Sequence, residues 1–319
     1  MTTTGPAHAA ADASPPGIVP TLAELVGLRA QVQRPAQARR GRHGLHGPAP
    51  SPLRGRGMEY AESREYAIGD DVRRMDWRLT ARTGRAHTKL FQAERERLTL
   101  LVADTAPALY FGTRTRFKSV QAARAGALAA WSALQAGDRI AALRGGEPAM
   151  PPAGGLRGTM RVLDALVRWY TRPPGDDAGL AVALEHAQRL LRPGARLVVL
   201  ADAASAAQVP PLRWTALARH HQATLLLLLD PLETAPPRRG LSLLGGARRV
   251  HLDLDLSAVR ARWDEALVGP ARELARTLPG LGWEVRMLSS DAPSGEWLQP
   301  PLPAVADAGP SPAPPAPLA

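Results

Sequence analysis

The stretch RLTLLVAD, residues 97–104, decides the fold, because it is a short and unbroken apolar run that ends in an aspartate. Two later stretches repeat this pattern, ARLVVLAD at 195–202 and ATLLLLLD at 223–230. Apolar runs of this length are typical of strands that are buried on both faces of a parallel sheet. The three stretches therefore predict the centre of a sheet with both faces covered.

Helical periodicity between these strands predicts the covering layers. Residues 117–137 place Val120, Ala127 and Trp131 on one face, and Gly137 follows as a C-terminal cap. Further amphipathic helices are expected at 159–170 and 179–191, a short one at 214–221, and a helix at 258–278 that Gly269-Pro270 should split. Strands are expected at 138–144 and 282–288, with a half-exposed edge strand at 248–256. The alternation predicts an α/β fold with a mostly parallel sheet.

Composition divides the chain into four segments. Residues 1–20 and 291–319 are rich in small residues and proline and are expected to be disordered. Residues 21–96 hold a predicted helix, a loop rich in arginine and glycine, and a densely charged segment. Residues 97–290 form the predicted α/β domain.

Bulk composition excludes several kinds of chemistry. The chain of 319 residues has no cysteine, which rules out disulfides, thiol nucleophiles and thiolate metal sites. The N-terminal residues show no signal-peptide pattern, and no apolar run reaches the roughly 20 residues that span a bilayer. We therefore expect a cytoplasmic protein without a membrane span.

The net charge of +11 raises the alternative of nucleic-acid binding. The positive excess is local, because seven arginines and no acid lie between Glu24 and Glu59. A solvated basic loop is the simpler interpretation, and a surface at 29–56 for nucleic acid or lipid headgroups is the alternative.

The segment REYAIGDDVRRMDW, residues 64–77, is unusual because its seven charges have nearly balanced sign. Residues 59–97 hold eight acids and nine bases. A surface that follows a nucleic-acid backbone would be one-sided, so the balance favours mutual pairing of arginines and carboxylates. The segment then forms either a structural lid or clamp on the sheet, or a docking surface or active site.

This segment closely resembles the signature of the domain of unknown function 58 family. A glycine-rich lead-in precedes the pattern R-x-Y-x-x-G-D-D-x-R-x-[IM]-D-W, followed by A-R-T and by a strand that leads to E-x-E. We predict that the residues matching this signature form an interaction site, and they are Arg64, Tyr66, Gly69, Asp70, Asp71, Arg73, Asp76, Trp77, Arg82, Thr83, Lys89, Glu94 and Glu96. Weaker likeness extends over about residues 21–290.

The resemblance implies a von Willebrand factor A-like, Rossmann-like α/β fold. It also implies an accessory role beside a MoxR-type AAA+ ATPase and its client protein, with no established enzymatic activity. The oligomeric state stays open.

Folds of this type often hold Mg²⁺ at the carboxyl end of the sheet through D-x-S-x-S, a threonine and a second aspartate. Here Asp104 and Asp202 are the weak candidate ligands, while alanine stands at the hydroxyl positions, Ala106, Ala108 and Ala178. Two carboxylates without hydroxyls make a poor cage for a hard cation, so a site without metal or other cofactor is favoured. Asp176 and Asp177 keep the magnesium alternative open.

A metal-dependent hydrolase at Asp76, Lys89 and Glu94 is a second alternative, although Lys89 precedes Glu94 and breaks the usual nuclease spacing. The sequence has no G-x-S-x-G elbow and no phosphate-binding loop. The leading hypothesis is therefore a non-enzymatic interaction module for the ATPase, with nucleic-acid binding and hydrolysis as alternatives.

Overall fold

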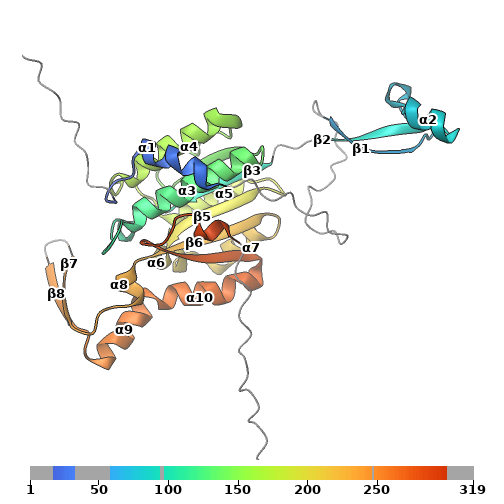
Figure 1. Cartoon of the computed structure of the whole chain (residues 1–319). Coiled ribbons are helices and arrows are strands. Elements are labelled where there is room, and N and C mark those ends of the chain that lie inside the picture. Colours follow the sequence, from blue (N-terminus) through green and yellow to red (C-terminus); the bar gives the residue numbers. More distant parts are fainter. Residues whose placement is uncertain (1–16, 33–57, 94–96, 246–247, 300–319) are drawn as a thin grey trace, which may run out of the picture.

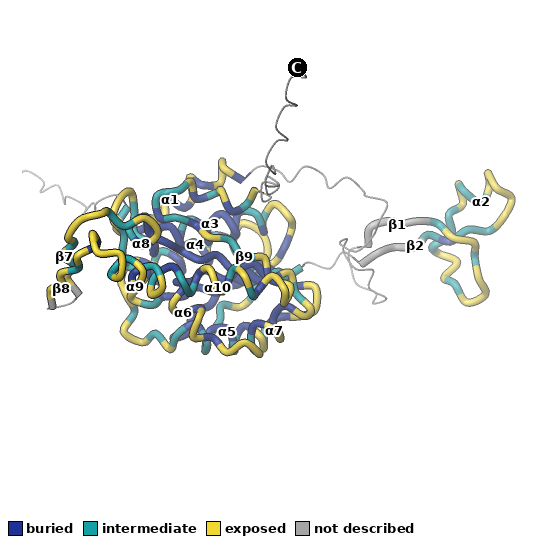
Figure 2. Tube along the Cα trace, turned by 90° about the horizontal axis from the view of Figure 1, so that it is seen from below, coloured by how far each residue is buried: buried dark blue, intermediate teal, exposed yellow. Residues whose placement is uncertain are grey.

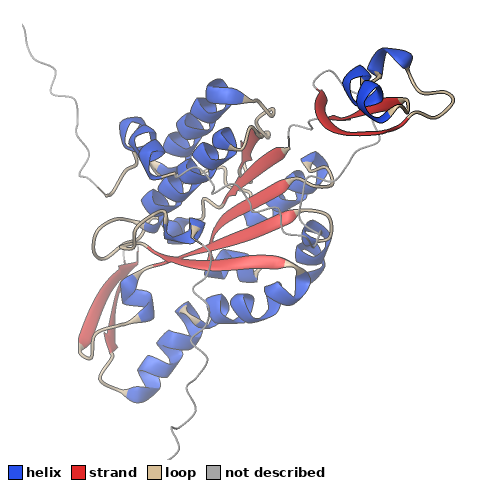
Figure 3. Ribbon diagram, turned by 45° about the vertical axis from the view of Figure 1, so that its right-hand side comes forward, coloured by secondary structure: helices blue, strands red, loops and turns tan. Residues whose placement is uncertain are grey.

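A computed structural model of the chain describes residues 17–32, 58–93, 97–245 and 248–299. Its centre is a five-stranded sheet in the order β4-β3-β5-β6-β9, in which every neighbouring pair is parallel. The strands are β3 (Leu98–Ala103), β4 (Arg139–Leu143), β5 (Arg196–Asp202), β6 (Gln222–Leu229) and β9 (Trp283–Ser289). The predicted α/β fold and its parallel sheet are confirmed (Figure 3).

Helices cover both faces of this sheet because its central strands are apolar on both sides. One face carries α3 (Lys118–Gln135) and α4 (Gly155–Tyr170), which pack on Leu101, Val198 and Leu226. The other face packs through Leu100, Val199 and Leu225. The helices on that second face are α5 (Leu180–Leu190), α6 (Ala203–Ala207), α7 (Pro211–Ala218) and α10 (Gly269–Thr277).

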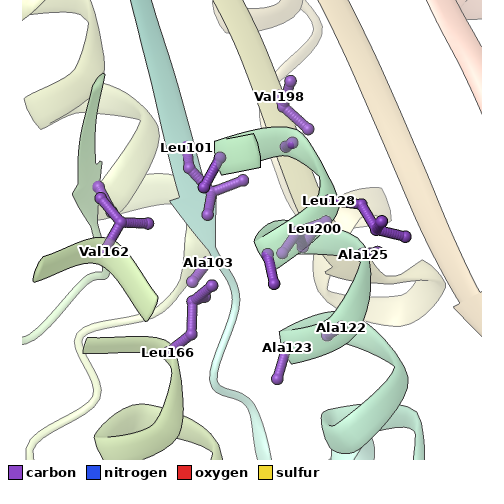
Figure 4. Packing of buried hydrophobic residues seen from close by; sticks show 14 of the residues in the cluster. Leu101, Ala103, Ala122, Ala123, Ala125, Leu128, Val162, Leu166, Val198 and Leu200 are labelled. Carbon is purple, nitrogen blue, oxygen red and sulfur yellow. The ribbon is translucent and has the colours of Figure 1, made fainter. Parts of the chain in front are cut away.

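Small residues allow α3 to lie close to the sheet. Ala125 of α3 lies near Leu200 of β5 in Figure 4, and both belong to the same buried cluster as Ala122 and Leu101. A Cβ atom added at Gly126 would meet side-chain atoms of Leu101, Leu166 and Leu200 at 3.0–3.1 Å. The close approach buries α3 almost completely, as its dark colour in Figure 2 shows.

The N-terminal helix packs on this α/β body. Helix α1 (Leu22–Gly27) begins at Thr21, whose hydroxyl accepts a hydrogen bond from the N–H of Glu24, and it continues into the 3₁₀ turn η1 (Leu28–Gln31). Leu25 is fully buried, and its carbonyl oxygen accepts a hydrogen bond of 3.0 Å from the indole of Trp131 in α3. The start of residues 21–96 therefore packs with α3 and α4.

The strand expected at the sheet edge near residues 248–256 lies elsewhere. β8 (Arg248–Asp253) pairs antiparallel with β7 (Gly240–Gly245) in a separate ribbon beside the body (Figure 1). The edge beside β6 is instead taken by β9, because residues 223–229 pair in register with 283–289. The predicted helix break is confirmed, since α9 (Ser257–Leu267) ends before Gly269 and α10 begins there.

The charged segment forms its own small unit, which we call the charged hairpin (residues 58–93). β1 (Met58–Glu65) pairs antiparallel with β2 (His87–Ala93), and the connection holds η2 (Val72–Arg74) and α2 (Trp77–Thr83). In Figures 1 and 3 this unit stands apart from the sheet and its helices.

The remaining short elements are η3 (Pro107–Leu109), α8 (Pro231–Thr234), η4 (Leu278–Leu281) and η5 (Glu296–Leu298). Over the described ranges, none of the helices is both long and apolar enough to cross a bilayer.

Candidate functional site

The carboxyl ends of the central strands hold a group of buried charges, which we call the strand-end cluster: Asp104, Lys118, Asp202, Asp230 and Glu233. Strand order reverses between β3 and β5, since the chain passes from β3 to β4 on one side and later to β5 on the other. In open α/β sheets, ligands bind outside the strand ends at such a reversal. Asp104 and Asp202 lie at this point, as the sequence predicted for the end of their strands.

Asp104 joins the ends of β3 and β5. One carboxylate oxygen accepts a hydrogen bond of 3.0 Å from the N–H of Ala106, and the other accepts one of 3.0 Å from the N–H of Asp202. Burial raises the pKa of Asp104 to about 6, although these hydrogen bonds oppose the rise. Asp104 thus links the end of β3 to the end of β5 through hydrogen bonds.

Asp202 is paired with a buried lysine that the sequence analysis did not select. The Lys118 ammonium donates to Asp202 Oδ2 at 2.7 Å and to Glu233 Oε1 at 2.6 Å. Lys118 is only 1% exposed, Asp202 6% and Glu233 8%, so all three charges are removed from water. Burial lowers the pKa of Lys118, but the two carboxylates outweigh it and the net shift is upward.

Glu233 and Asp230 form a capping box at the start of α8. Asp230 Oδ1 accepts from the N–H of Leu232 at 2.9 Å, and Glu233 Oε2 accepts from the N–H of Asp230 at 2.7 Å. Asp230 also accepts hydrogen bonds from Thr113 and Ser290. Burial raises the pKa of Asp230, but these donors outweigh it and the net pKa lies below its ordinary value.

Two sequence signals point to the missed residues. The stretch DPLE at 230–233 has the acid-x-x-Glu spacing of a capping box. Lys118 is one of only two lysines in the chain, and it begins a helix, where the helix dipole disfavours a cation. A lysine that is buried at that position needs a carboxylate partner, but the sequence shows neither the burial nor the partner.

The other aspartates considered as magnesium ligands are held elsewhere. Asp176 accepts from Arg144 at 2.9 and 3.1 Å, and Asp177 Oδ1 accepts from the N–H of Gly179 at 2.9 Å. Among the residues that the structure describes, no three histidine, aspartate or glutamate side chains gather in a way that suits a metal ion.

The charged hairpin is ordered mainly by short-range hydrogen bonds. Asp76 caps α2 by accepting from the N–H of Leu79 at 3.0 Å, and it accepts from the Ser63 hydroxyl of β1 at 2.8 Å. The hydrogen bond from the N–H of Leu79 lowers the pKa of Asp76, and the hydrogen bond from Ser63 and the positive charge of Lys89 also lower it. The Thr83 hydroxyl closes α2 by donating to the carbonyl oxygen of Leu79.

The turn before α2 is built by adjacent acids. Gly69 has φ of 106°, a left-handed conformation that a side chain would strain. Asp70 accepts from the N–H of Ala67 at 2.9 Å and from Arg64 at 2.7 Å, and Asp71 accepts from the N–H of Arg73 at 3.0 Å. The backbone N–H of Tyr66 reaches across to the carbonyl oxygen of Ala86.

Among the hairpin side chains that the structure describes, ionic pairing joins β1 to the connection between the two strands. Between the side chains that the structure describes there, two ion pairs form, Arg64–Asp70 and Arg85–Glu65. Arg73, Asp71 and Arg82 are exposed. Glu94 and Glu96 of the signature lie outside the described residues, as does the loop from Arg34 to Arg56; Arg29 lies over the Trp131 ring at 5.5 Å.

Apolar side chains are exposed among these charges. Ile68 is 104% exposed, Trp77 66% and Val72 58%, and all three lie in the turn and helix between β1 and β2. Figure 2 shows this end of the hairpin as mainly exposed, in contrast to the body.

These features fit what comparison with known proteins finds. Residues 62–269 match the family described as "Protein of unknown function DUF58". The chain therefore belongs to this family, as the signature predicted. Uncharacterized proteins of Mycobacterium bovis and of two Mycobacterium tuberculosis strains are each 32% identical over 266 residues, which cover 80% of this chain and 80% of each relative. No solved structure gives a significant match.

Proposed function

We propose that this chain is a non-enzymatic protein-interaction module and that the charged hairpin is its docking surface. The observation that carries this proposal is the exposure of Ile68, Val72 and Trp77 within ten residues of one another, surrounded by charged side chains. Interfaces are enriched in exposed aromatic residues and arginine, and a few such anchors supply most of the binding free energy.

The geometry of the hairpin supports a presenting role. The Asp76 cap and the Arg64–Asp70 ion pair fix the backbone around the apolar residues, so little freedom is lost when a partner binds. Arginines and acids on the same unit can pair with opposite charges on a partner and fix its orientation.

The partner that we propose is a MoxR-type AAA+ ATPase or its client, with the α/β body serving as a von Willebrand factor A-like platform in the cytoplasm. The support for this identity is the family signature at residues 64–83 and the parallel sheet with acidic strand ends. Nucleic-acid binding by residues 29–56 and hydrolysis at Asp76 stay as alternative predictions.

The test is binding of the purified full chain to a purified MoxR-type AAA+ ATPase from the same organism. The double variant Ile68→Ser with Trp77→Ala should weaken binding about tenfold or more, because it removes the central anchors of the surface. Its thermal midpoint should stay close to wild type, since both side chains are exposed.

The matched control is Leu212→Ser, which removes an apolar side chain that is 83% exposed on α7 of the body. This variant should bind like wild type. If the hairpin variant binds as tightly as the control, the hairpin is not the docking surface; if the wild-type chain does not bind the ATPase, the proposed partner is wrong.

A further inference from the structure

The two carboxylates that hold Lys118 are arranged in the same way. Asp202 uses Oδ1 to accept from the N–H of Ala204 at 2.9 Å and Oδ2 to accept from the ammonium. Glu233 uses Oε2 for the N–H of Asp230 and Oε1 for the ammonium. Each carboxylate thus fixes the start of one helix and directs its second oxygen at the same nitrogen atom.

The surroundings keep this pair of oxygens rigid. Asp202 is the last residue of β5, and its own N–H donates a hydrogen bond to Asp104. The carbonyl oxygen of Glu233 accepts a hydrogen bond of 3.0 Å from the indole of Trp263, which ties α8 to α9. Two carboxylate oxygens are therefore held in place by contacts that do not involve Lys118.

Within the described ranges, the hydrogen bonds of the Lys118 ammonium go to Asp202 and Glu233. Lys118 is the first residue of α3, where the positive end of the helix dipole repels a cation. Its side chain is 2% exposed, so water does not solvate the charge. A buried ammonium is costly unless paired, so these two carboxylates hold it there.

We propose that Asp202 and Glu233 form a cation-binding site at the carboxyl edge of the sheet and that Lys118 occupies it as a cation supplied by the chain itself. The ligand class of this site is a primary alkylammonium ion. In the wild-type protein the site is closed to dissolved cations, because Lys118 is covalently attached and already fills it.

The test uses chemical rescue of Lys118→Ala. This substitution removes three methylene groups and the ammonium, which together match propylammonium. Added propylammonium should raise the thermal midpoint of the variant in a saturable way, since a ligand that binds only the folded state stabilises it. Wild type should show no such rise at the same concentrations and ionic strength.

Further variants separate specific binding from general salt effects. Asp202→Asn in the Lys118→Ala background should weaken propylammonium binding about tenfold or more, because one charge-assisted hydrogen bond is lost. The triple variant Lys118→Ala, Asp202→Asn, Glu233→Gln should not respond. Tetramethylammonium, which has no N–H donor, is the matched control ligand.

The outcomes decide the proposal directly. Rescue of Lys118→Ala by propylammonium that depends on Asp202 and Glu233 supports it, whereas stabilisation by Mg²⁺ with none by propylammonium contradicts the assigned ligand class. If Lys118→Ala does not fold, the double variant Lys118→Ala, Glu233→Gln is used instead, because it leaves only one buried carboxylate, Asp202, without a cation. Propylammonium is then titrated into this variant in the same way. The proposal is overturned if neither variant responds to propylammonium, or if wild type responds equally.

Discussion

The strand-end cluster and the charged hairpin are both rich in charge, but they use it in opposite ways. At the strand ends, Lys118 is bound by Asp202 and Glu233, and all three are nearly inaccessible to water. In the hairpin, Arg73, Asp71 and Arg82 are exposed, and the ordered contacts are mostly caps on backbone N–H groups. Charge density along the sequence therefore does not indicate where charges pair; burial does, because only there is an unpaired charge costly.

The largest loss of stability is expected when the buried cation is removed. Lys118→Met keeps the length of the side chain but leaves two buried carboxylates unpaired, so it should lower the free energy of unfolding by about 3–5 kcal/mol. Urea unfolding measures the loss. The triple variant Lys118→Met, Asp202→Asn, Glu233→Gln should recover most of it, and a stable single variant would mean that the cluster is not desolvated.

The second prediction concerns pH. Folding raises the pKa of Asp104 from 3.8 to about 6, so the folded state binds this proton more tightly than the unfolded state. The stabilisation is complete below about pH 4 and is lost as pH rises to about 6, for a total of about 3 kcal/mol. Asp104→Asn should remove this part of the dependence.

The measurement is the difference in unfolding free energy between wild type and Asp104→Asn at a series of pH values from 4 to 7. Subtraction is needed because Asp230, with a lowered pKa, contributes in the opposite direction as pH falls. A difference that does not change with pH would show that Asp104 is solvated, like the acids of the hairpin.

The smallest effect is expected in the hairpin. Asp70→Ala removes the ion pair with Arg64, whose side chain is 44% exposed, and it should change stability by at most about 1 kcal/mol. The change should shrink further in high salt, because exposed charges are screened. Thermal unfolding at low and high salt checks this, and a loss as large as that of Lys118→Met would mean that the hairpin charges are as strongly coupled as the buried ones.

The sequence by itself determined the parallel sheet, because residues 97–104, 195–202 and 223–230 are apolar on both faces and end in aspartates. It also determined the family, because the signature at residues 64–83 is long and specific. The helix break at Gly269-Pro270 followed from backbone chemistry that acts locally.

Which charged side chains pair with one another follows from the tertiary structure and not from the sequence. Lys118 is 84 residues from Asp202 and 115 from Glu233, and no local pattern specifies a pair across such distances. The same limit explains why β8 pairs with β7 rather than at the sheet edge, since alternating polarity suits a strand in either place. Local propensity acts over a few residues, whereas strand order and the depth of a side chain depend on how all the elements pack together.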